Sequence, residues 1–173
     1  TSYMSKQKLI ILRGYPGSGK TTVGKQLENR GLGKFIDHNA ILTFVTKIAG
    51  NDDGIYDQIA HLEIAICAKL ISEGRTVIVA RGFSKLSSLL PYEQIAKEAG
   101  VQSIIIRLNV SQKELANRVT APARKLDFNP TINEHELRKW VTNNPLESKM
   151  GEIIIDNQKP LNKVLSEIKQ AIS

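Results

Sequence analysis

The nine residues from Gly14 to Thr22, GYPGSGKTT, constrain the fold more than any other part of the 173-residue sequence. They include three glycines and a proline, which favour neither helix nor strand. The apolar residues 9–12 before them are typical of a strand buried on both faces. In residues 20–29, Val23 and Leu27 stand four apart, as on one face of a helix. The sequence therefore predicts a strand, a tight glycine-rich turn and a helix, in that order.

Strand and helix patterns alternate along the rest of the chain. Further strands are expected at residues 35–36, 76–80, 101–108 and 152–155, and helices at residues 55–70 and 86–99, after Ser111, near Asn133 and after Pro160. The length fits one domain over residues 1–173. The alternation predicts the α/β class, with a five-stranded parallel sheet and helices on both faces. Ligands of such sheets bind beyond the carboxyl ends of the strands, so the residues after each strand are the candidate functional residues.

After the first strand, Gly14, Gly19, Lys20 and Thr21 match the pattern G-x-x-x-x-G-K-[ST] of a P-loop. Its glycines let backbone N–H groups converge on phosphate oxygens, and the following helix directs its positive end at the same anion. Lys20 is expected to contact the β- and γ-phosphates of ATP, and the Thr21 hydroxyl to bind Mg²⁺. The predicted ATP-binding loop residues are Gly14, Tyr15, Pro16, Gly17, Ser18, Gly19, Lys20, Thr21 and Thr22. A turn with a purely structural role is the alternative.

Asp37 follows the second strand, in KFIDHNAIL. A carboxylate there is expected to face the γ-phosphate region, where it would orient and deprotonate a substrate hydroxyl or help to hold Mg²⁺. An N-cap for the helix that starts at His38 suits Asp equally well, and the two roles are compatible. His38 is a weaker candidate for a functional role, and a polar surface role is favoured for it.

Arg81 follows the third strand, in VIVARGFSK. P-loop proteins usually place an aspartate near the end of one such strand to hold Mg²⁺, and neither Ala80 nor Arg81 can do so. Arg81 is instead a candidate clamp for an anionic substrate. An ion pair with a neighbouring carboxylate is the alternative.

Residues 119–140 are expected to form a lid, because residues 120–132 have no apolar period. Arg118 and Arg124 would then stabilise charge on the transferring phosphoryl group as catalytic residues with Lys20 and Asp37. A solvated basic loop is the alternative. After the last strand, Asn157 is a candidate contact for the adenine of ATP, although a turn and helix start also explain this composition.

The net charge of +7 and the pI of about 9.5 favour anionic partners, including nucleotides and nucleic acid. The one cysteine, Cys67, lies in the apolar stretch LEIAICAKL and is expected to be a small buried residue. No apolar run reaches the length of a membrane span, and no signal-peptide pattern is present, so a cytoplasmic location is expected. Residues 1–3, ahead of Met4, are expected to be a cloning remnant.

The chain resembles the small P-loop kinases, in particular the group of phage-type polynucleotide 5′-kinases, zeta-toxin-like kinases and chloramphenicol phosphotransferases. Gly14–Thr22 matches their G-x-P-G-S-G-K-[ST] loop, including Pro16. Residues 93–100 (EQIAKEAG) look like the helix before their fourth strand, residues 116–119 (ANRV) like the start of their lid, and IIIDNQKPL like their last strand and turn. The resemblance implies a P-loop NTPase fold with a small lid.

By this resemblance, Asp37 stands for the general base of the family, and Arg118 and Arg124 for its lid arginines. Two departures are visible. The family often has an Asp-Thr-Asn type segment where this chain has Arg81, Gly82 and Phe83. Polynucleotide kinases have an arginine three residues after the base, where this chain has Ala40. The second departure weakens the case for a nucleic-acid 5′-end as substrate.

The expected function is that of an ATP- and Mg²⁺-dependent kinase that phosphorylates a hydroxyl of a small molecule, a nucleoside or a nucleic-acid 5′-end. Arg81 and Asp37 are its expected substrate-binding residues. A regulatory nucleotide-binding NTPase with little kinase activity is the first alternative, and a nucleic-acid-binding protein that uses the basic surface is the second. The sequence does not identify the acceptor or the oligomeric state.

Overall fold

The computed structural model describes residues 6–122 and 132–173, which form a five-stranded, all-parallel sheet with the strand order β2-β3-β1-β4-β5. The strands are β1 (Lys8–Arg13), β2 (Lys34–Ile36), β3 (Val77–Ala80), β4 (Gln102–Asn109) and β5 (Ile153–Asp156). This is the P-loop NTPase fold of the α/β class that the sequence predicts, and each predicted strand forms within two residues of its expected bounds.

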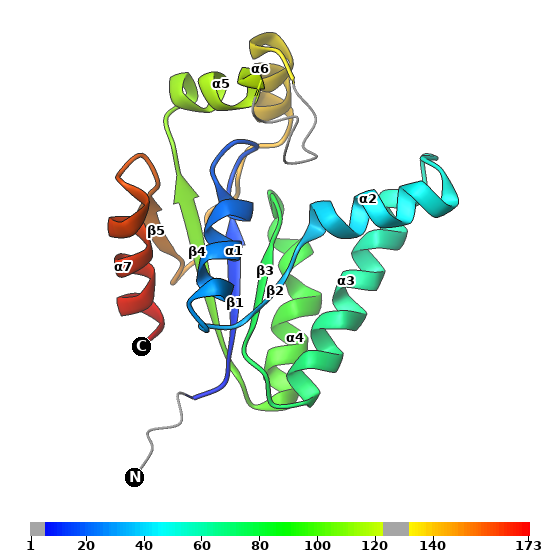
Figure 1. Ribbon diagram of the computed structural model, residues 1–173, viewed down its shortest axis with the longest axis vertical. Coiled ribbons are helices and arrows are strands. Elements are labelled where there is room, and N and C mark those ends of the chain that lie inside the picture. Colours follow the sequence, from blue (N-terminus) through cyan, green and yellow to red (C-terminus); the bar gives the residue numbers. More distant parts are fainter. Residues whose placement is uncertain (1–5, 123–131) are drawn as a thin grey trace.

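Helices cover both faces of the sheet, and the alternation along β1 shows how (Figure 1). Ile10 and Leu12 pack with the helices α1 (Lys20–Asn29) and α7 (Leu161–Ile172). Leu9 and Ile11 point to the other face, where α3 (Ile55–Ser72) and α4 (Leu90–Ala99) lie. All four apolar residues are 0% exposed, which is why this strand has no polar position.

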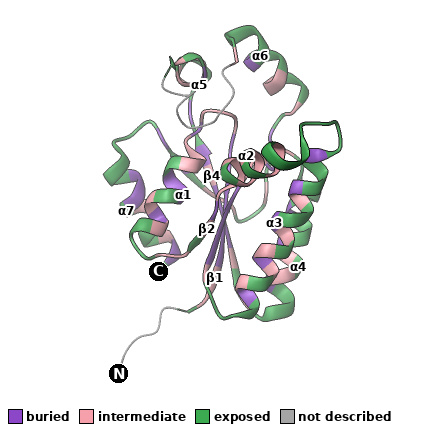
Figure 2. Cartoon of the chain, turned by 45° about the vertical axis from the view of Figure 1, so that its right-hand side comes forward, coloured by how far each residue is buried: buried purple, intermediate pink, exposed green. Residues whose placement is uncertain are grey.

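Figure 2 shows the same layering, with the buried residues gathered on the strands and on the inward faces of the helices. The segment predicted as one helix over residues 86–99 begins as a short 3-10 helix, η1 (Leu86–Leu89), before α4. The capping box expected for Ser111 with Glu114 forms only in part, and a full capping box forms at Asn133. Ser111 Oγ accepts from the Glu114 N–H (3.3 Å), and Asn133 forms a full capping box with Glu136.

The buried face of α3 matches the expected one only in part. The sequence pattern places Ile55, Ile59, Leu62, Ile66 and Leu70 on it; the first two are buried and the last two partly buried, but Leu62 is 43% exposed. The fully buried residues recur every four positions: Ile55, Ile59, Glu63, Cys67 and Ile71. A carboxylate therefore lies in the middle of an otherwise apolar row, and Cys67 is buried as predicted.

Three helices lie above or beside the carboxyl ends of the strands: α2 (His38–Ala49), α5 (Gln112–Thr120) and α6 (Glu134–Asn143) (Figure 1). Val119 and Leu137 bring α5 and α6 together in a small apolar cluster that Tyr15 joins. Of the expected lid, residues 134–140 belong to α6, and residues 123–131 lie outside the described part of the chain. No described helix is both long and apolar enough to cross a membrane.

Candidate active site

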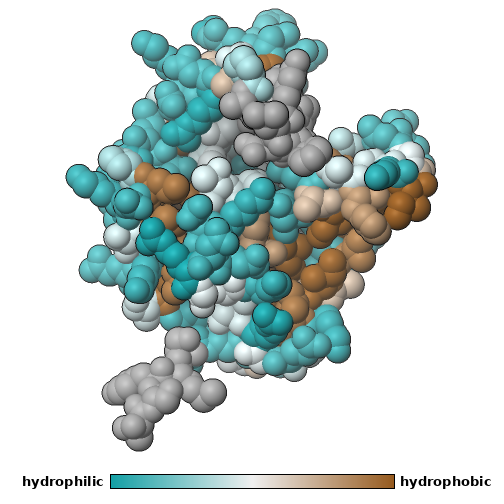
Figure 3. Space-filling model, viewed as in Figure 1, coloured by the Kyte–Doolittle hydropathy of each residue, from teal (hydrophilic) through white to brown (hydrophobic). Residues whose placement is uncertain are grey.

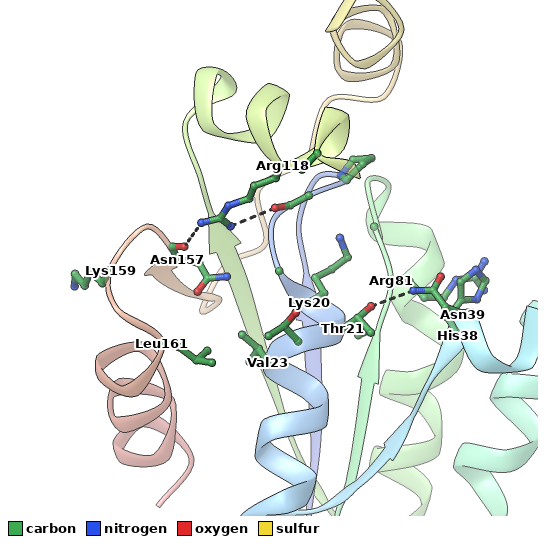
Figure 4. A pocket seen from close by; sticks show the side chains of 17 residues that line it. Lys20, Thr21, Val23, His38, Asn39, Arg81, Arg118, Asn157, Lys159 and Leu161 are labelled. Carbon is green, nitrogen blue, oxygen red and sulfur yellow. Dashed lines mark hydrogen bonds between the residues drawn. The ribbon is translucent and has the colours of Figure 1, made fainter. Parts of the chain in front are cut away.

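A cavity of about 640 Å³ opens at the carboxyl end of the sheet (Figure 4). The loop before α1 forms its floor, through Pro16, Gly17 and residues 19–22. The start of α2 and the end of β3 line one side, and α5 and the turn after β5 line the other. The topology thus brings the residues after all five strands to one place, as the sheet type predicts.

The loop backbone is shaped by glycines that no other residue could replace without strain. Gly17 and Gly19 have φ angles of 84° and 92°, in the left-handed region. A Cβ on Gly14 would lie 2.8 Å from the Leu108 carbonyl oxygen of β4, so the loop passes directly against the sheet. This close approach is the physical reason for the glycines of the motif.

Lys20, the first residue of α1, extends back over the loop. Its Nζ donates to the carbonyl oxygens of Gly14 (2.9 Å) and Tyr15 (3.0 Å) and to Ser18 Oγ (3.3 Å). The ammonium group is thereby held among the backbone groups of the loop and beside the N-terminus of α1. This is a suitable environment for bound phosphate oxygens.

Thr21 lies next to Lys20 in the cavity, and its Oγ1 accepts a hydrogen bond from Asn39 Nδ2 of α2 (3.2 Å). A hydroxyl oxygen has a second lone pair, which is left for a cation. Mg²⁺ prefers oxygen ligands and often takes only one or two from the protein, with phosphates and water completing the octahedron. Among the described residues no cluster of three acidic, histidine or cysteine side chains is present. Thr21 fits such a sparse site.

Asp37 is where the sequence places it, but its carboxylate is engaged in a structural role. Oδ1 accepts from the backbone N–H groups of Asn39 (3.1 Å) and Ala40 (3.2 Å) and so caps α2. Oδ2 lies 3.6 Å from Lys25 Nζ. The described residues that line the cavity include His38 and Asn39 but not Asp37. The N-cap alternative is thus confirmed, and the role of Asp37 as general base stays a prediction.

Arg81 lines the cavity at the end of β3 and also forms the ion pair that the sequence offered as the alternative. Its Nη1 lies 3.3 Å from Glu63 Oε2, and the other oxygen of Glu63 lies 2.7 Å from His38 Nδ1. His38 is therefore not a surface residue as expected, since its side chain is only 23% exposed. The sequence interpretation missed Glu63, and the signal for it was a charged residue in register with Ile59 and Cys67.

Arg118 and Asn157 brace the loop from the opposite side (Figure 4). Arg118 donates from Nη1 to the Gly17 carbonyl (3.2 Å), from Nη2 to the Asn157 carbonyl (2.8 Å) and from Nε to Glu114 (3.0 Å). Asn157 Nδ2 donates to the Ser18 carbonyl (2.6 Å). Both line the cavity on the nucleotide side, and their predicted contacts with ATP stay predictions.

Tyr15, a further predicted loop residue, does not direct its side chain into the cavity. The Tyr15 side chain points to the lid, where its hydroxyl accepts from the Leu146 N–H (3.0 Å) and its ring meets Trp140 edge-on at 6.1 Å. Only the backbone of Tyr15 therefore serves the loop. Arg124 lies outside the described residues.

A second residue that sequence reasoning missed is Arg13, at the end of β1. Its side chain is 0% exposed, and it donates to Glu152 Oε2 (2.9 Å) and to the carbonyl oxygens of Glu147 (2.8 Å) and Phe83 (2.6 Å). Phe83 has a positive φ of 47°, which is unusual outside glycine. Arg13 thus stabilises the strained turn that follows Arg81.

Tyr92 and Cys67, two buried side chains near Glu63, have raised pKa values. Burial raises the pKa of the Tyr92 phenol, and the nearby Glu63 carboxylate raises it further, whereas Arg81 lowers it. Burial alone raises the pKa of the Cys67 thiol to about 12. Both side chains pack behind the acidic group that Arg81 and His38 share.

A family model described as an AAA domain matches residues 9–143, which include the loop, Arg81 and Arg118. The chain belongs to this family. No curated protein shows significant similarity to the sequence.

Solved structures with the same fold include three kinases at 18% sequence identity. A putative kinase from Chloroflexus aurantiacus J-10-fl has a TM-score of 0.76 over 98% of this chain and 97% of that one. A shikimate kinase from Acinetobacter baumannii, in complex with shikimate, has a TM-score of 0.66 over 97% and 94% of the two chains. A gluconokinase from Sinorhizobium meliloti 1021 has a TM-score of 0.63 over 95% and 91%. At this identity the likeness establishes the fold.

Proposed function

We propose that this AAA-domain protein is an ATP-dependent kinase that transfers the γ-phosphoryl group to a hydroxyl of a small anionic molecule. The observation that carries the proposal is the composition of the cavity. The titratable side chains among its described lining residues are all basic: Lys20, His38, Arg81, Arg118 and Lys159. Cations on the loop side suit the phosphates of ATP, and Arg81 lies apart from them, on the side of α2 and β3.

The donor side of the reaction would use the loop as the sequence predicts. Lys20 and the backbone N–H groups bind the phosphates, and the Thr21 hydroxyl holds Mg²⁺, which would neutralise charge on the β- and γ-phosphates. Arg118 lies beside Gly17 and would stabilise charge that develops on the transferring group. Arg124 is proposed for the same task on the resemblance alone.

The acceptor side rests on Arg81. The guanidinium presents several donors in a plane and can pair with a carboxylate or phosphate group of the acceptor. The fold neighbours named as a shikimate kinase and a gluconokinase support a small-molecule acceptor. The finer resemblance, to polynucleotide 5′-kinases, zeta-toxin-like kinases and chloramphenicol phosphotransferases, keeps nucleosides and nucleic-acid ends among the acceptors to be tested.

A second candidate function is that of a nucleotide-binding regulator with little kinase activity. One observation favours it. β3 ends at Ala80 and Arg81 follows it, so this chain has no aspartate at the strand end where P-loop enzymes usually place one to help hold Mg²⁺. Such a protein would bind ATP without consuming it in the presence of any acceptor.

An acceptor screen decides between the two functions. ATP consumption is measured with hydroxy acids, sugar acids, sugar phosphates, nucleosides and oligonucleotide 5′-ends, and phosphorylated products are identified by ³¹P NMR. We expect turnover with at least one hydroxylated anion, and none in the Lys20→Ala variant. ATP binding without turnover across the whole panel would favour the regulator, and turnover only with neutral acceptors would contradict the role of Arg81.

A further inference from the structure

The carboxylate of Glu63 joins two side chains of the acceptor side from behind. It is 3% exposed and lies in the middle of α3, while His38 begins α2 and Arg81 follows β3. Oε1 lies 2.7 Å from His38 Nδ1, and Oε2 lies 3.3 Å from Arg81 Nη1. Burial of a carboxylate is costly unless it is paired, so this position needs both partners. The proposed function, on which the following inference rests, uses Arg81 alone of the three.

The short contact with Glu63 determines the tautomer of a neutral His38. An ionised carboxylate can only accept, so the 2.7 Å contact requires a proton on Nδ1. In the neutral ring the lone pair then lies on Nε2, which points away from Glu63. His38 lines the same cavity as Lys20 and Thr21, and its side chain is 23% exposed (Figure 4). A base oriented by a buried carboxylate is the arrangement found in catalytic triads.

Asp37 lacks these properties. Both hydrogen bonds of its Oδ1 go to the first backbone N–H groups of α2, and these bonds would weaken if the carboxylate took up a proton. Its other oxygen is 3.6 Å from Lys25. His38, the next residue, faces the cavity and has one nitrogen without such a structural task.

We propose that His38, oriented by Glu63, is the general base that takes the proton of the acceptor hydroxyl. The acceptor oxygen forms a bond to the γ-phosphorus of ATP. The bond from that phosphorus to the β–γ bridging oxygen breaks, and its electron pair stays on ADP. The hydroxyl proton passes to Nε2 of His38 and leaves for solvent with the products. Glu63 is a positioning residue, because it acts through His38 and Arg81.

The charged and titratable groups around His38 come from several elements. Glu63 faces it from α3, and Arg81, at the end of β3, faces the same carboxylate. Tyr92 of α4 lies close enough to Glu63 and Arg81 for both to affect its pKa. On its own element, His38 follows Asp37, and Lys20 of α1 shares the cavity. Replacing Glu63 should therefore change the pH dependence of turnover as well as the position of the ring.

An NMR experiment tests the tautomer without any acceptor. Long-range ¹H–¹⁵N spectra of the full chain at pH 8 resolve three histidines, and the variants His38→Gln and His61→Gln assign two of them. We expect protonated Nδ1 and bare Nε2 for His38 in the wild type, and a loss of this preference in Glu63→Gln. A His38 ring that is protonated on Nε2 in the wild type would overturn the proposal.

Kinetics with the acceptor from the screen test the base itself. We expect His38→Gln to lower kcat by about 10²-fold or more, with little change in the KM for ATP, and to remove the acidic limb of the kcat pH profile. His61→Gln is the matched control, because His61 is an exposed histidine on α3, and it should leave turnover unchanged. Glu63→Gln should shift the acidic limb, which a merely structural role would leave in place.

Asp37→Asn separates the two candidate bases, because asparagine caps a helix as well as aspartate does. We expect this variant to lose far less activity than His38→Gln. If His38→Gln keeps near wild-type kcat, or keeps the acidic limb of the profile, His38 is not the base. If the wild-type protein consumes ATP and His38→Gln gives either of these results, the inference about His38 is wrong and the proposed kinase function still stands. Absence of any ATP-dependent product would instead count against the kinase function.

Discussion

The two halves of the cavity are built in different ways. The half proposed for the nucleotide comes mostly from one continuous stretch, Gly14–Thr22, with Arg118 and Asn157 beside it, and many of its groups are backbone groups held by glycine conformations. The acceptor half comes from His38, Glu63 and Arg81, on three elements, and its groups are side chains around one buried carboxylate. A phosphate chain is the same in every ATP, so fixed backbone dipoles can bind it. An acceptor differs between enzymes, and side chains can be exchanged without changing the fold.

Lys20→Ala should give the largest effect and should not depend on the acceptor. The ammonium group donates three hydrogen bonds within the loop and has no substitute among its neighbours there. We expect kcat/KM to fall by about 10³-fold, as for the loss of a donor that stabilises transition-state charge. Steady-state rates of ADP formation measure it.

Arg81→Met is the counterpart on the acceptor half. It should raise the KM for the acceptor and leave the KM for ATP unchanged. An equal rise in both KM values would show that the two halves do not work separately.

Arg13→Met should give the next largest effect, on stability, because Arg13 is a fully buried charge with three hydrogen-bond partners. Its guanidinium joins the turn at Phe83 to Glu147 and Glu152. Removing one partner of a buried pair leaves the other charge uncompensated, and we expect the free energy of unfolding to fall by about 3 kcal/mol. Urea unfolding followed by circular dichroism gives this value.

The matched control for Arg13 stands beside it in the sheet. Arg107 pairs in register with Arg13, is 20% exposed and lies 3.8 Å from the same Glu152. A longer contact from a side chain that is partly open to solvent is worth less, so Arg107→Met should cost less than about 1 kcal/mol. Equal losses in the two variants would contradict the buried role of Arg13.

The difference between the halves also explains what the sequence could predict. The loop, the individual strands and the start of α1 follow from local signals, because each is predicted from a short continuous stretch of residues. The separation of 25 positions between His38 and Glu63 gives no sign in the sequence that these side chains meet. Glu63 lies in a row of otherwise apolar residues spaced four apart on α3, and the sequence pattern predicts a buried face that does not include it. Only the packing of α3 against the sheet shows that this carboxylate points inward.

Asp37 gives the opposite lesson, because the sequence offered two compatible roles and the structure confirms the one with local geometry, while the role as base stays a prediction. An N-cap needs only the next three residues, whereas a base needs a substrate hydroxyl nearby. Arg81 likewise forms the ion pair that was the alternative, and it also lines the cavity. Local patterns thus identify structural roles of charged residues more readily than catalytic ones.

Thr21→Val should have a smaller effect, confined to the dependence on metal. Valine keeps the shape of threonine but has no oxygen for Mg²⁺ and none for Asn39 Nδ2. We expect about tenfold to hundredfold lower kcat/KM, with a higher Mg²⁺ concentration needed for half-maximal activity. Thr21→Ser keeps the hydroxyl and should retain most of the activity. If both variants respond alike to Mg²⁺, Thr21 does not hold the metal.

Cys67 offers the mildest test, because it reports on α3 without entering the cavity. It lies one helical turn after Glu63 in the same buried row. Burial raises its thiol pKa from 9.0 to about 12, so the folded protein keeps this proton at pH values where the unfolded chain releases it. Cys67 therefore supports stability below about pH 9, and this contribution is lost as the pH rises toward 12.

A thiol reagent at pH 8 should consequently label Cys67 slowly in the native protein and at once in urea, since the thiolate is the reactive form. Glu63→Gln should speed native labelling several-fold, because it removes the negative charge that Arg81 and His38 share and so loosens the packing of α3 against β3. Lys20→Ala changes only the nucleotide half and should leave the labelling rate as it is. Faster labelling in Lys20→Ala as well would mean that α3 responds to the loop, and the two halves would then be one mechanical unit.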